Sequence, residues 1–213
     1  MKRAAVLLLF ICVHATAAPT FLQNATLLSG PQILTSGSLT SNTSAFLILE
    51  RSQFVLPSQV TLDTLTNGIT YSTFWPGTSS TLPAGTLVDV WLFHVQRSGY
   101  SLGNMTATID FGAPILGYAG RGICGLGGAC LSSTDAFGNP GSVYATGPLR
   151  GLELLISGDS IMQSSDSAVT ISAITSAFFL DEVRIFTVSN PEPGTLLLTG
   201  ISLFLFAARR RFR

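Results

Sequence analysis

Basic residues are scarce in this chain outside its two ends. Lys2 is the only lysine, and Lys2, Arg3 and four arginines of the last five residues account for more than half of the 11 basic residues. Residues 19–189 hold five arginines against ten acidic residues, a formal net charge of −5. Phosphate binding needs lysine and arginine, so this composition argues against a nucleic-acid partner. Mild negative charge favours solubility instead.

Catalytic patterns are almost absent as well. His94 is the only histidine after residue 14, and no G-x-S-x-G motif accompanies it, so a Ser–His–Asp triad would have to recruit distant partners. We interpret His94 as a structural histidine, one that hydrogen-bonds its neighbours in a strand. A pair of acidic residues for glycoside hydrolysis stays open, because such pairs are set by spatial separation and not by sequence spacing.

Cysteine is rare, and its spacing limits what it can do. Cys12 lies in an apolar N-terminal run, which leaves Cys124 and Cys130 as the cysteines of the domain. We expect these two to form a disulfide in an oxidising compartment. Zinc would need two further ligands, which no second Cys or His pair supplies. Their glycine-rich segment, 120–141, is either a surface binding loop or a locally stapled connection; we favour the second. No lysine follows these glycines in the P-loop pattern, which argues against a phosphate-binding loop.

The first 17 residues read as a secretory signal peptide. Lys2 and Arg3 form a positive start, Ala4–Val13 is apolar, and Ala15-Thr16-Ala17 fits the cleavage rule for small residues. The apolar run is too short to serve as a membrane anchor. Removal by signal peptidase would leave a mature chain that begins at Ala18 or Pro19.

The last 24 residues, 190–213, contain three blocks in a fixed order. Pro191-Glu192-Pro193 ends the preceding domain, because proline lacks an N–H and disfavours helix before it. Thr195–Ala208 is uncharged, and Arg209, Arg210 and Arg211 follow it. As a helix the uncharged run would extend about 21 Å at ~1.5 Å per residue, short of the roughly 30 Å of a bilayer core. We predict a marginal transmembrane helix whose arginines stay in the cytoplasm.

This three-part tail resembles the PEP-CTERM sorting signal of Gram-negative bacteria. The resemblance is carried by Pro191, Glu192 and Pro193, by the uncharged run, and by Arg209, Arg210 and Arg211. Asn190 departs from the valine that often precedes the first proline. The resemblance implies export, recognition by an exosortase-type membrane protease, and processing of the tail after transient residence in the inner membrane. A GPI signal is similar in this respect, because its hydrophobic tail is absent from the mature protein.

Residues 18–189 predict one all-β domain. Short alternating or β-branched runs lie between turn signals, and no long helical periodicity interrupts them. Asn67-Gly68 predicts a hairpin between the strands on either side of it. Eight or nine strands fit a single antiparallel β-sandwich of jelly-roll type. Residues 19–43 are expected to form a loose leader or an edge strand. The predicted strands are Ala45–Leu56, Val60–Leu65, Ile69–Phe74, Thr86–Gln96, Met105–Phe111, Ile115–Tyr118, Leu152–Ile156, Ala168–Ile174 and Glu182–Val188.

The domain also resembles PEP-CTERM exported proteins that carry an uncharacterised β-domain. The residues that carry this resemblance are Gly85–His94, Ile109–Phe111, Pro114–Gly117, Arg150–Glu153 and Asp181–Ile185. This likeness supports one domain and implies no catalytic residues.

Together these features predict an exported, non-enzymatic protein of the cell surface or of an exopolysaccharide or biofilm matrix, without a cofactor. The alternative is a carbohydrate-binding module, in a calcium-dependent form if loop oxygens converge on the ion. An extracellular hydrolase is the third hypothesis. The loop residues considered for calcium are Asp135, Asn139, Asp159 and Asp166, and the aromatic residues considered for stacking on sugars are Trp75, Trp91 and Tyr100.

Overall fold

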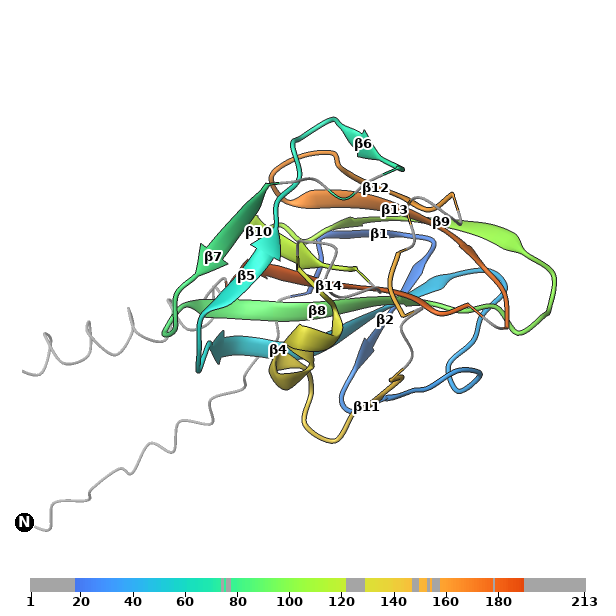
Figure 1. Cartoon of the computed structure of the whole chain (residues 1–213), viewed down its shortest axis with the longest axis horizontal. Coiled ribbons are helices and arrows are strands. Elements are labelled where there is room, and N and C mark those ends of the chain that lie inside the picture. Colours follow the sequence, from blue (N-terminus) through green and yellow to red (C-terminus); the bar gives the residue numbers. More distant parts are fainter. Residues whose placement is uncertain are drawn as a thin grey trace, which may run out of the picture. The chain divides into compact units, whose positions relative to one another are not determined.

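Strands dominate the computed structural model (Figure 1). The structure describes residues 18–73, 75, 78–121, 129–146, 150–152, 154, 158–177 and 179–189. The predicted signal peptide, residues 1–17, Cys124 and the predicted sorting tail, residues 190–213, lie outside this description. Within the described residues, no helix has the length and apolar character needed to span a bilayer.

Two larger sheets and one small ribbon make up the described fold. The five-stranded sheet has the order β1 (Phe21–Gln23), β9 (Gly103–Asp110), β13 (Ala168–Thr175), β12 (Ser160–Gln163), β6 (Thr70–Tyr71). The seven-stranded sheet has the order β2 (Ala25–Ser29), β4 (Ala45–Val55), β8 (Leu87–Val95), β14 (Asp181–Val188), β10 (Ile115–Ala119), β5 (Val60–Asp63), β7 (Ser79–Leu82). The ribbon pairs β3 (Ile33–Leu34) with β11 (Val143–Tyr144), and a 3-10 helix, η1, spans Ser132–Phe137.

The two larger sheets pack against each other through a shared apolar core. Successive side chains of a strand point to opposite faces, so β13 buries Val169, Ile171 and Ala173 while Thr170 and Ser172 face outward. The seven-stranded sheet contributes Trp91 and Ile185 to the same core. This arrangement confirms a β-rich fold with multiple sheets, as the alternation predicts.

The seven-stranded sheet is buried on its second face too. Phe186 lies there in edge contact with Phe137 of η1, with ring centroids 6.2 Å apart. Leu92 packs with Leu131 and Leu34 on the same side. The layer formed by η1, β3 and β11 therefore covers this face, and every residue of β14 except Val188 is buried.

Two predictions about strand pairing are wrong. The Asn67-Gly68 turn is present, with φ +79° at Gly68, but β5 and β6 on either side of it belong to different sheets and form no hairpin. The sheets are also not wholly antiparallel, because β2 runs parallel to β4 and β3 runs parallel to β11. Local turn residues specify a change of direction, but not which sheet receives the next strand.

The segment 19–43, expected to be a loose leader or an edge strand, supplies three strands, β1, β2 and β3, of which β1 and β2 are edge strands. Asn24 is the corner between β1 in one sheet and β2 in the other. It adopts φ +56°, a conformation that asparagine tolerates better than most residues, and its side-chain amide donates to the Thr106 carbonyl at 3.1 Å. One nearly continuous stretch of chain therefore provides an edge strand to each of the two larger sheets.

We predict that Gly117→Ala destabilises the domain by roughly 1–3 kcal/mol, the usual cost of overpacking. A methyl group at Gly117 would lie 2.6 Å from the Leu62 Cβ atom and 3.0 Å from the Asp63 carbonyl oxygen, where β10 approaches β5. Urea unfolding measures the change. Gly99→Ala is the control, because nothing lies within 4 Å of its added methyl group. Equal stability of the two variants would contradict the close approach.

Candidate functional site

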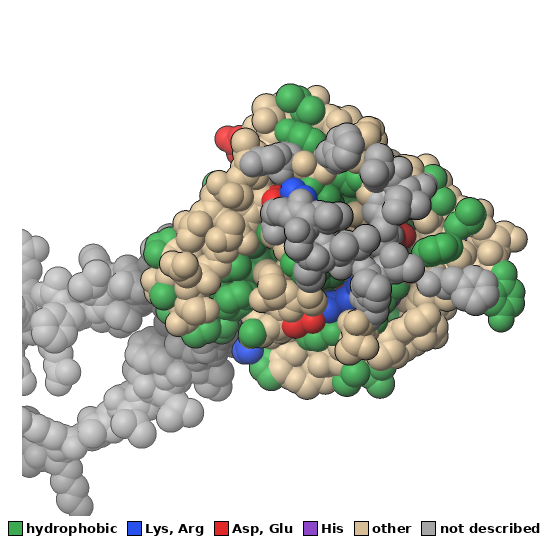
Figure 2. Space-filling model, in the orientation of Figure 1, with side chains coloured by type: hydrophobic (Ala, Val, Ile, Leu, Met, Phe, Trp, Pro, Cys, Tyr) green, Lys and Arg blue, Asp and Glu red, His purple; other side chains and the backbone are tan. Residues whose placement is uncertain are grey.

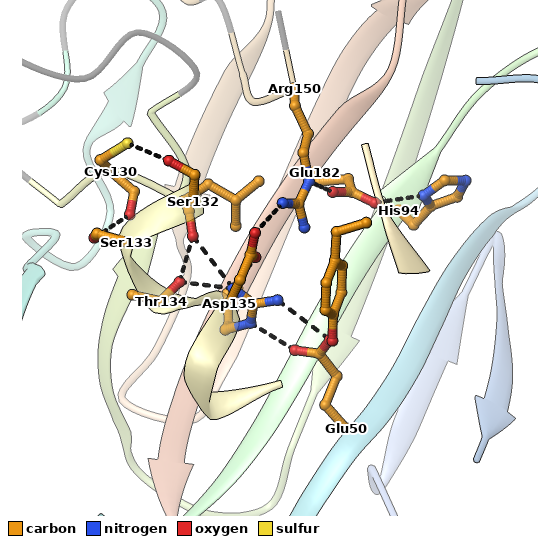
Figure 3. A network of polar contacts seen from close by, with 12 residues as sticks. Glu50, His94, Cys130, Ser132, Ser133, Thr134, Asp135, Arg150 and Glu182 are labelled. Carbon is orange, nitrogen blue, oxygen red and sulfur yellow. Dashed lines mark hydrogen bonds and ion pairs between the residues drawn. The ribbon is translucent and has the colours of Figure 1, made fainter. Parts of the chain in front are cut away.

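Six ionisable side chains gather on the covered face of the seven-stranded sheet (Figure 3). Alternation along β14 places Glu182 and Arg184 on this face, beside His94 of β8 and Glu50 of β4. Asp135 of η1 and Arg150 approach from the covering layer. We call this set the buried charged cluster: Glu50, His94, Asp135, Arg150, Glu182 and Arg184.

Arg184 is the centre of the buried charged cluster, and its guanidinium is fully engaged. The Nε and Nη2 atoms donate to the two carboxylate oxygens of Glu50 at 2.6 and 3.2 Å. The Nη1 atom donates to Thr134 Oγ1 at 2.7 Å, to Asp135 Oδ1 at 3.0 Å and to the Leu131 carbonyl at 3.3 Å. Arg184 therefore ties strand β4 and the 3-10 helix to strand β14 at one point.

Arg150 holds the other half of the cluster. Its Nη1 donates to Asp135 Oδ2 at 2.6 Å, and its Nε donates to Glu182. The guanidinium carbons of Arg150 and Arg184 lie 4.7 and 5.2 Å from the centroid of the Tyr144 ring, within cation–π range. The Tyr144 hydroxyl donates to Glu50 Oε1. The covering layer is thus linked to the sheet by charge as well as by apolar contact.

His94 completes the charge balance. Its Nδ1 lies 2.8 Å from Glu182 Oε1, and its Nε2 lies 2.9 Å from the Leu39 carbonyl oxygen. A doubly protonated ring would donate to both partners, because a carboxylate and a carbonyl oxygen accept hydrogen bonds. With that ring, three cations face three carboxylates. His94 is buried in β8 and hydrogen-bonded through both ring nitrogens.

The environment keeps Glu182 and Arg184 in their charged forms and Tyr144 in its neutral form. Burial alone would raise the pKa of Glu182, but the hydrogen bond and charge of His94, together with Arg150, hold this pKa below its ordinary value. Burial works against the charged form of Arg184, yet Glu50 and Asp135 raise its pKa further. Burial, followed by the Glu50 charge, raises the pKa of Tyr144. A general acid or base has to change its charge near working pH, and these groups resist that change.

Access to the buried charged cluster is restricted. The side chains of Glu50, His94, Glu182 and Arg184 are 0% exposed, and only Asp135, at 29%, reaches solvent to a considerable degree. Buried ion pairs of this kind link layers and are costly to break. The geometry therefore favours a structural role for the buried charged cluster.

The predicted disulfide lies at the border of the covering layer. Cys130 is disulfide-bonded and precedes η1, whose Ser132 hydroxyl lies 3.2 Å from the Cys130 sulfur. The Ser133 hydroxyl donates to the Cys130 carbonyl at 2.6 Å. Cys124 lies outside the described residues, as do Pro191, Glu192, Pro193, Arg209, Arg210 and Arg211.

The loop residues considered for calcium have separate partners. Asp135 binds the two arginines of the cluster, and Asp159 accepts from the Ile174 N–H at 2.8 Å. Asp166 accepts from the Asn67 side chain at 2.6 Å, and the Asn139 N–H donates to Tyr144 at 3.0 Å. Across the described part of the chain, no group of three or more His, Cys, Asp or Glu side chains is placed to hold a metal ion.

The three aromatic residues considered for sugars are in different surroundings. Trp91 is 2% exposed and donates to Thr187 Oγ1 at 3.2 Å, so it belongs to the core. Trp75 is half-buried and packs against Gly120. Tyr100 is 77% exposed, and so it is the candidate best placed to meet a ligand.

Comparison with known protein families, with curated proteins and with solved structures finds no match.

The buried charged cluster is the feature that sequence reasoning missed. A signal was present, because Glu182 and Arg184 occupy alternate positions of β14 beside the apolar residues Val183, Ile185 and Phe186. Their partners, Glu50 and Arg150, are far away in the sequence and could not be identified from spacing.

We predict that Glu182→Gln lowers the free energy of unfolding at pH 7 by about 3–5 kcal/mol, because it leaves His94 and Arg150 without their shared anion. The lowered pKa of Glu182 means that its stabilisation is complete above the ordinary value of 4.5 and is lost as the pH falls through the folded-state pKa. Urea unfolding from pH 7 to pH 3 should therefore show a weaker acid dependence in the variant.

Asp166→Asn is the matched control, since this carboxylate lies at the surface and binds one amide. It should change stability by less than about 0.5 kcal/mol. If Glu182→Gln behaved like this control at every pH, the buried charged cluster would not be stabilising the fold.

For the predicted disulfide, we expect non-reducing peptide mapping of exported protein to recover one peptide that links Cys124 to Cys130. The closed loop is short, so its reduction should cost at most about 2–3 kcal/mol. Free thiols at both positions would overturn the prediction.

Proposed function

We propose that the chain is an exported, non-enzymatic protein of the cell surface or extracellular matrix, sorted by an exosortase-like system. One observation carries the proposal: the order of Pro191-Glu192-Pro193, an uncharged run and Arg209-Arg210-Arg211 in one short tail. A signal peptide over residues 1–17 provides the matching export signal at the N-terminus.

The properties of residues 18–189 support a display role. The single histidine of this span is held between two acceptors, and the carboxylates of Glu50 and Glu182 are buried in ion pairs. These groups stabilise a domain and are poorly placed to act on a substrate. In the proposal the domain is a β-sandwich of jelly-roll type that is presented outside the cell without a cofactor.

The sorting route follows from the charges at the two ends. Lys2 and Arg3 keep the N-terminus in the cytoplasm and the tail arginines keep the C-terminus there, so the domain between them is translocated. Signal peptidase then cuts near Ala17. The short C-terminal helix holds the protein in the inner membrane until an exosortase-type protease cuts near Pro191-Glu192-Pro193.

A carbohydrate-binding module is the second candidate, favoured by the exposure of Tyr100. It is compatible with export, because an exopolysaccharide matrix would surround the released domain. The two candidates differ in whether the domain itself recognises the matrix.

We expect the mature extracellular protein to lack residues from about Pro193 to Arg213. Replacing Pro191-Glu192-Pro193 with three alanines should leave the full tail in place and retain the protein in the inner membrane. Intact mass of extracellular protein and immunoblots of membrane fractions measure both effects.

Asn190→Ala is the matched control, since it alters the same turn and keeps the Pro-Glu-Pro block. It should be processed like the unmodified chain. Extracellular material that retains the arginine tail would show that the tail is not a sorting signal.

A further inference from the structure

The outward face of β9 and β13 is rich in hydroxyl and amide side chains and almost uncharged. Alternation along the two strands turns Met105, Ala107 and Val169 inward and leaves mainly hydroxyl and amide side chains outside, together with Ile174. Among the outward-facing residues of these fully described strands, Asp110 is the one ionisable group, and it lies at the end of β9. The view in Figure 2 shows mostly hydrophobic and uncharged polar side chains, with small groups of Lys or Arg and of Asp or Glu between them.

Hydrogen bonds hold these outward side chains in a regular array. The Thr106 and Ser172 hydroxyl oxygens are 2.9 Å apart, and those of Thr108 and Thr170 are 3.0 Å apart. Ser172 also donates to Asn104 Oδ1 at 2.7 Å. The two hydroxyl pairs join residues directly opposite in the β9–β13 register, and Asn104 lies diagonal to Ser172. A hydroxyl both donates and accepts, so these groups keep capacity for a ligand. We call Asn104, Thr106, Thr108, Thr170 and Ser172 the hydroxyl face.

An aromatic tip continues the hydroxyl face. Tyr100 and Leu102, 77% and 64% exposed, directly precede β9, and Phe179, 39% exposed, follows β13. The Ala177 N–H donates to the Gly99 carbonyl at 2.9 Å, which joins the two loops. Neither loop, 98–102 or 176–180, contains a charged residue. Arg97 packs its guanidinium against Gly103 at the base of this tip.

The aromatic tip lies at one end of the described domain, and the residues where the described chain begins and ends lie at the other. Strand β14 runs from Asp181, next to the tip, to Val188, whose N–H donates to Pro114 at the other end. Thr20 pairs with Asp110 at that same far end. Eight residues of β14 cover about 27 Å at ~3.4 Å per residue, so the aromatic tip is distant from both ends of the described domain.

We propose that the hydroxyl face and the aromatic tip together bind a neutral polysaccharide. Hydroxyl and amide groups can exchange hydrogen bonds with sugar hydroxyls, and the Tyr100 ring offers an amphipathic surface for the apolar side of a pyranose ring. An anionic polymer would need several cations, and here only the half-buried Arg97 lies close. A lipid surface would leave the threonine and serine hydroxyls in an apolar medium, which is costly.

This inference rests on the proposed export, because it names the matrix component that the exported domain would meet. The two can fail separately. Polysaccharide binding is measured on purified protein, whereas tail processing is measured on the mass of the secreted product. Binding without processing would retain the site and remove the sorting proposal, and processing without binding would do the reverse.

The test uses the full chain, purified in detergent. Sedimentation with microcrystalline cellulose and affinity electrophoresis in dextran and in a soluble β-1,3-glucan probe neutral polymers, and alginate is the anionic comparison. We expect retention by at least one neutral polymer and none by alginate. Tyr100→Ala should weaken it about tenfold, the factor for a contact worth about 1.4 kcal/mol. Thr106→Val, which removes one hydroxyl, should weaken it as well.

Two matched controls lie on other surfaces. Thr81→Val removes a hydroxyl from the Thr61–Thr81 pair, whose oxygens are 3.3 Å apart, on the other sheet. Ile33→Ser changes an exposed apolar residue of the β3–β11 ribbon. Both should bind like the unmodified chain. Absence of retention by all three neutral polymers, retention by alginate alone, or binding unchanged in Tyr100→Ala and Thr106→Val would overturn the proposal. The proposal would also be overturned if the unmodified chain bound no polysaccharide but formed a dimer that Tyr100→Ala dissociates. The face would then join two copies of the chain.

Discussion

The fold depends on neutralising the charges that the seven-stranded sheet buries beneath its covering layer. Arg184 is fully buried in β14 and reaches Glu50 of β4 and Asp135 of η1. A charge in this position is tolerated only when it is paired and its donors are satisfied. The covering layer is therefore more than an apolar lid, because it supplies part of the charge that the sheet requires. His94 and Glu182 extend the same balance toward Leu39 in the N-terminal segment.

This constraint distinguishes the seven-stranded sheet, which is covered on both faces, from the outward face of the five-stranded sheet. One face of the seven-stranded sheet meets the sandwich core and the other meets the covering layer, so neither is free to recognise a partner. The outward face of the five-stranded sheet carries hydroxyl and amide groups in a regular array. In the proposal, recognition lies on the five-stranded sheet and the buried charged cluster on the seven-stranded sheet, so the polysaccharide site can change without disturbing the charges that hold the fold.

Much of the fold was predictable from alternation, and little of the charged cluster was. Strand β13 falls where buried and partly exposed residues alternate, and β4, β8 and β14 fall in segments rich in apolar and β-branched residues. Short edge strands carry less of this signal, because β1 has only three residues and β7 is rich in serine and threonine. Predicted strand Leu152–Ile156 includes residues outside the described part of the chain. The pairing of Arg184 with Glu50 joins residues 134 positions apart, and a single sequence contains no signal for such a distance.

The charge balance of the cluster is the central claim, and the protonation of His94 tests it directly. The chain has two histidines, His14 and His94, so a chain processed by signal peptidase retains one imidazole to observe. Nitrogen-15 NMR of the folded protein near neutral pH distinguishes a doubly protonated ring from either neutral tautomer. The account predicts protons on both Nδ1 and Nε2, with Nδ1 hydrogen-bonded to Glu182. A neutral ring with one bare nitrogen would contradict it, because the cluster would then bury one more negative charge than positive.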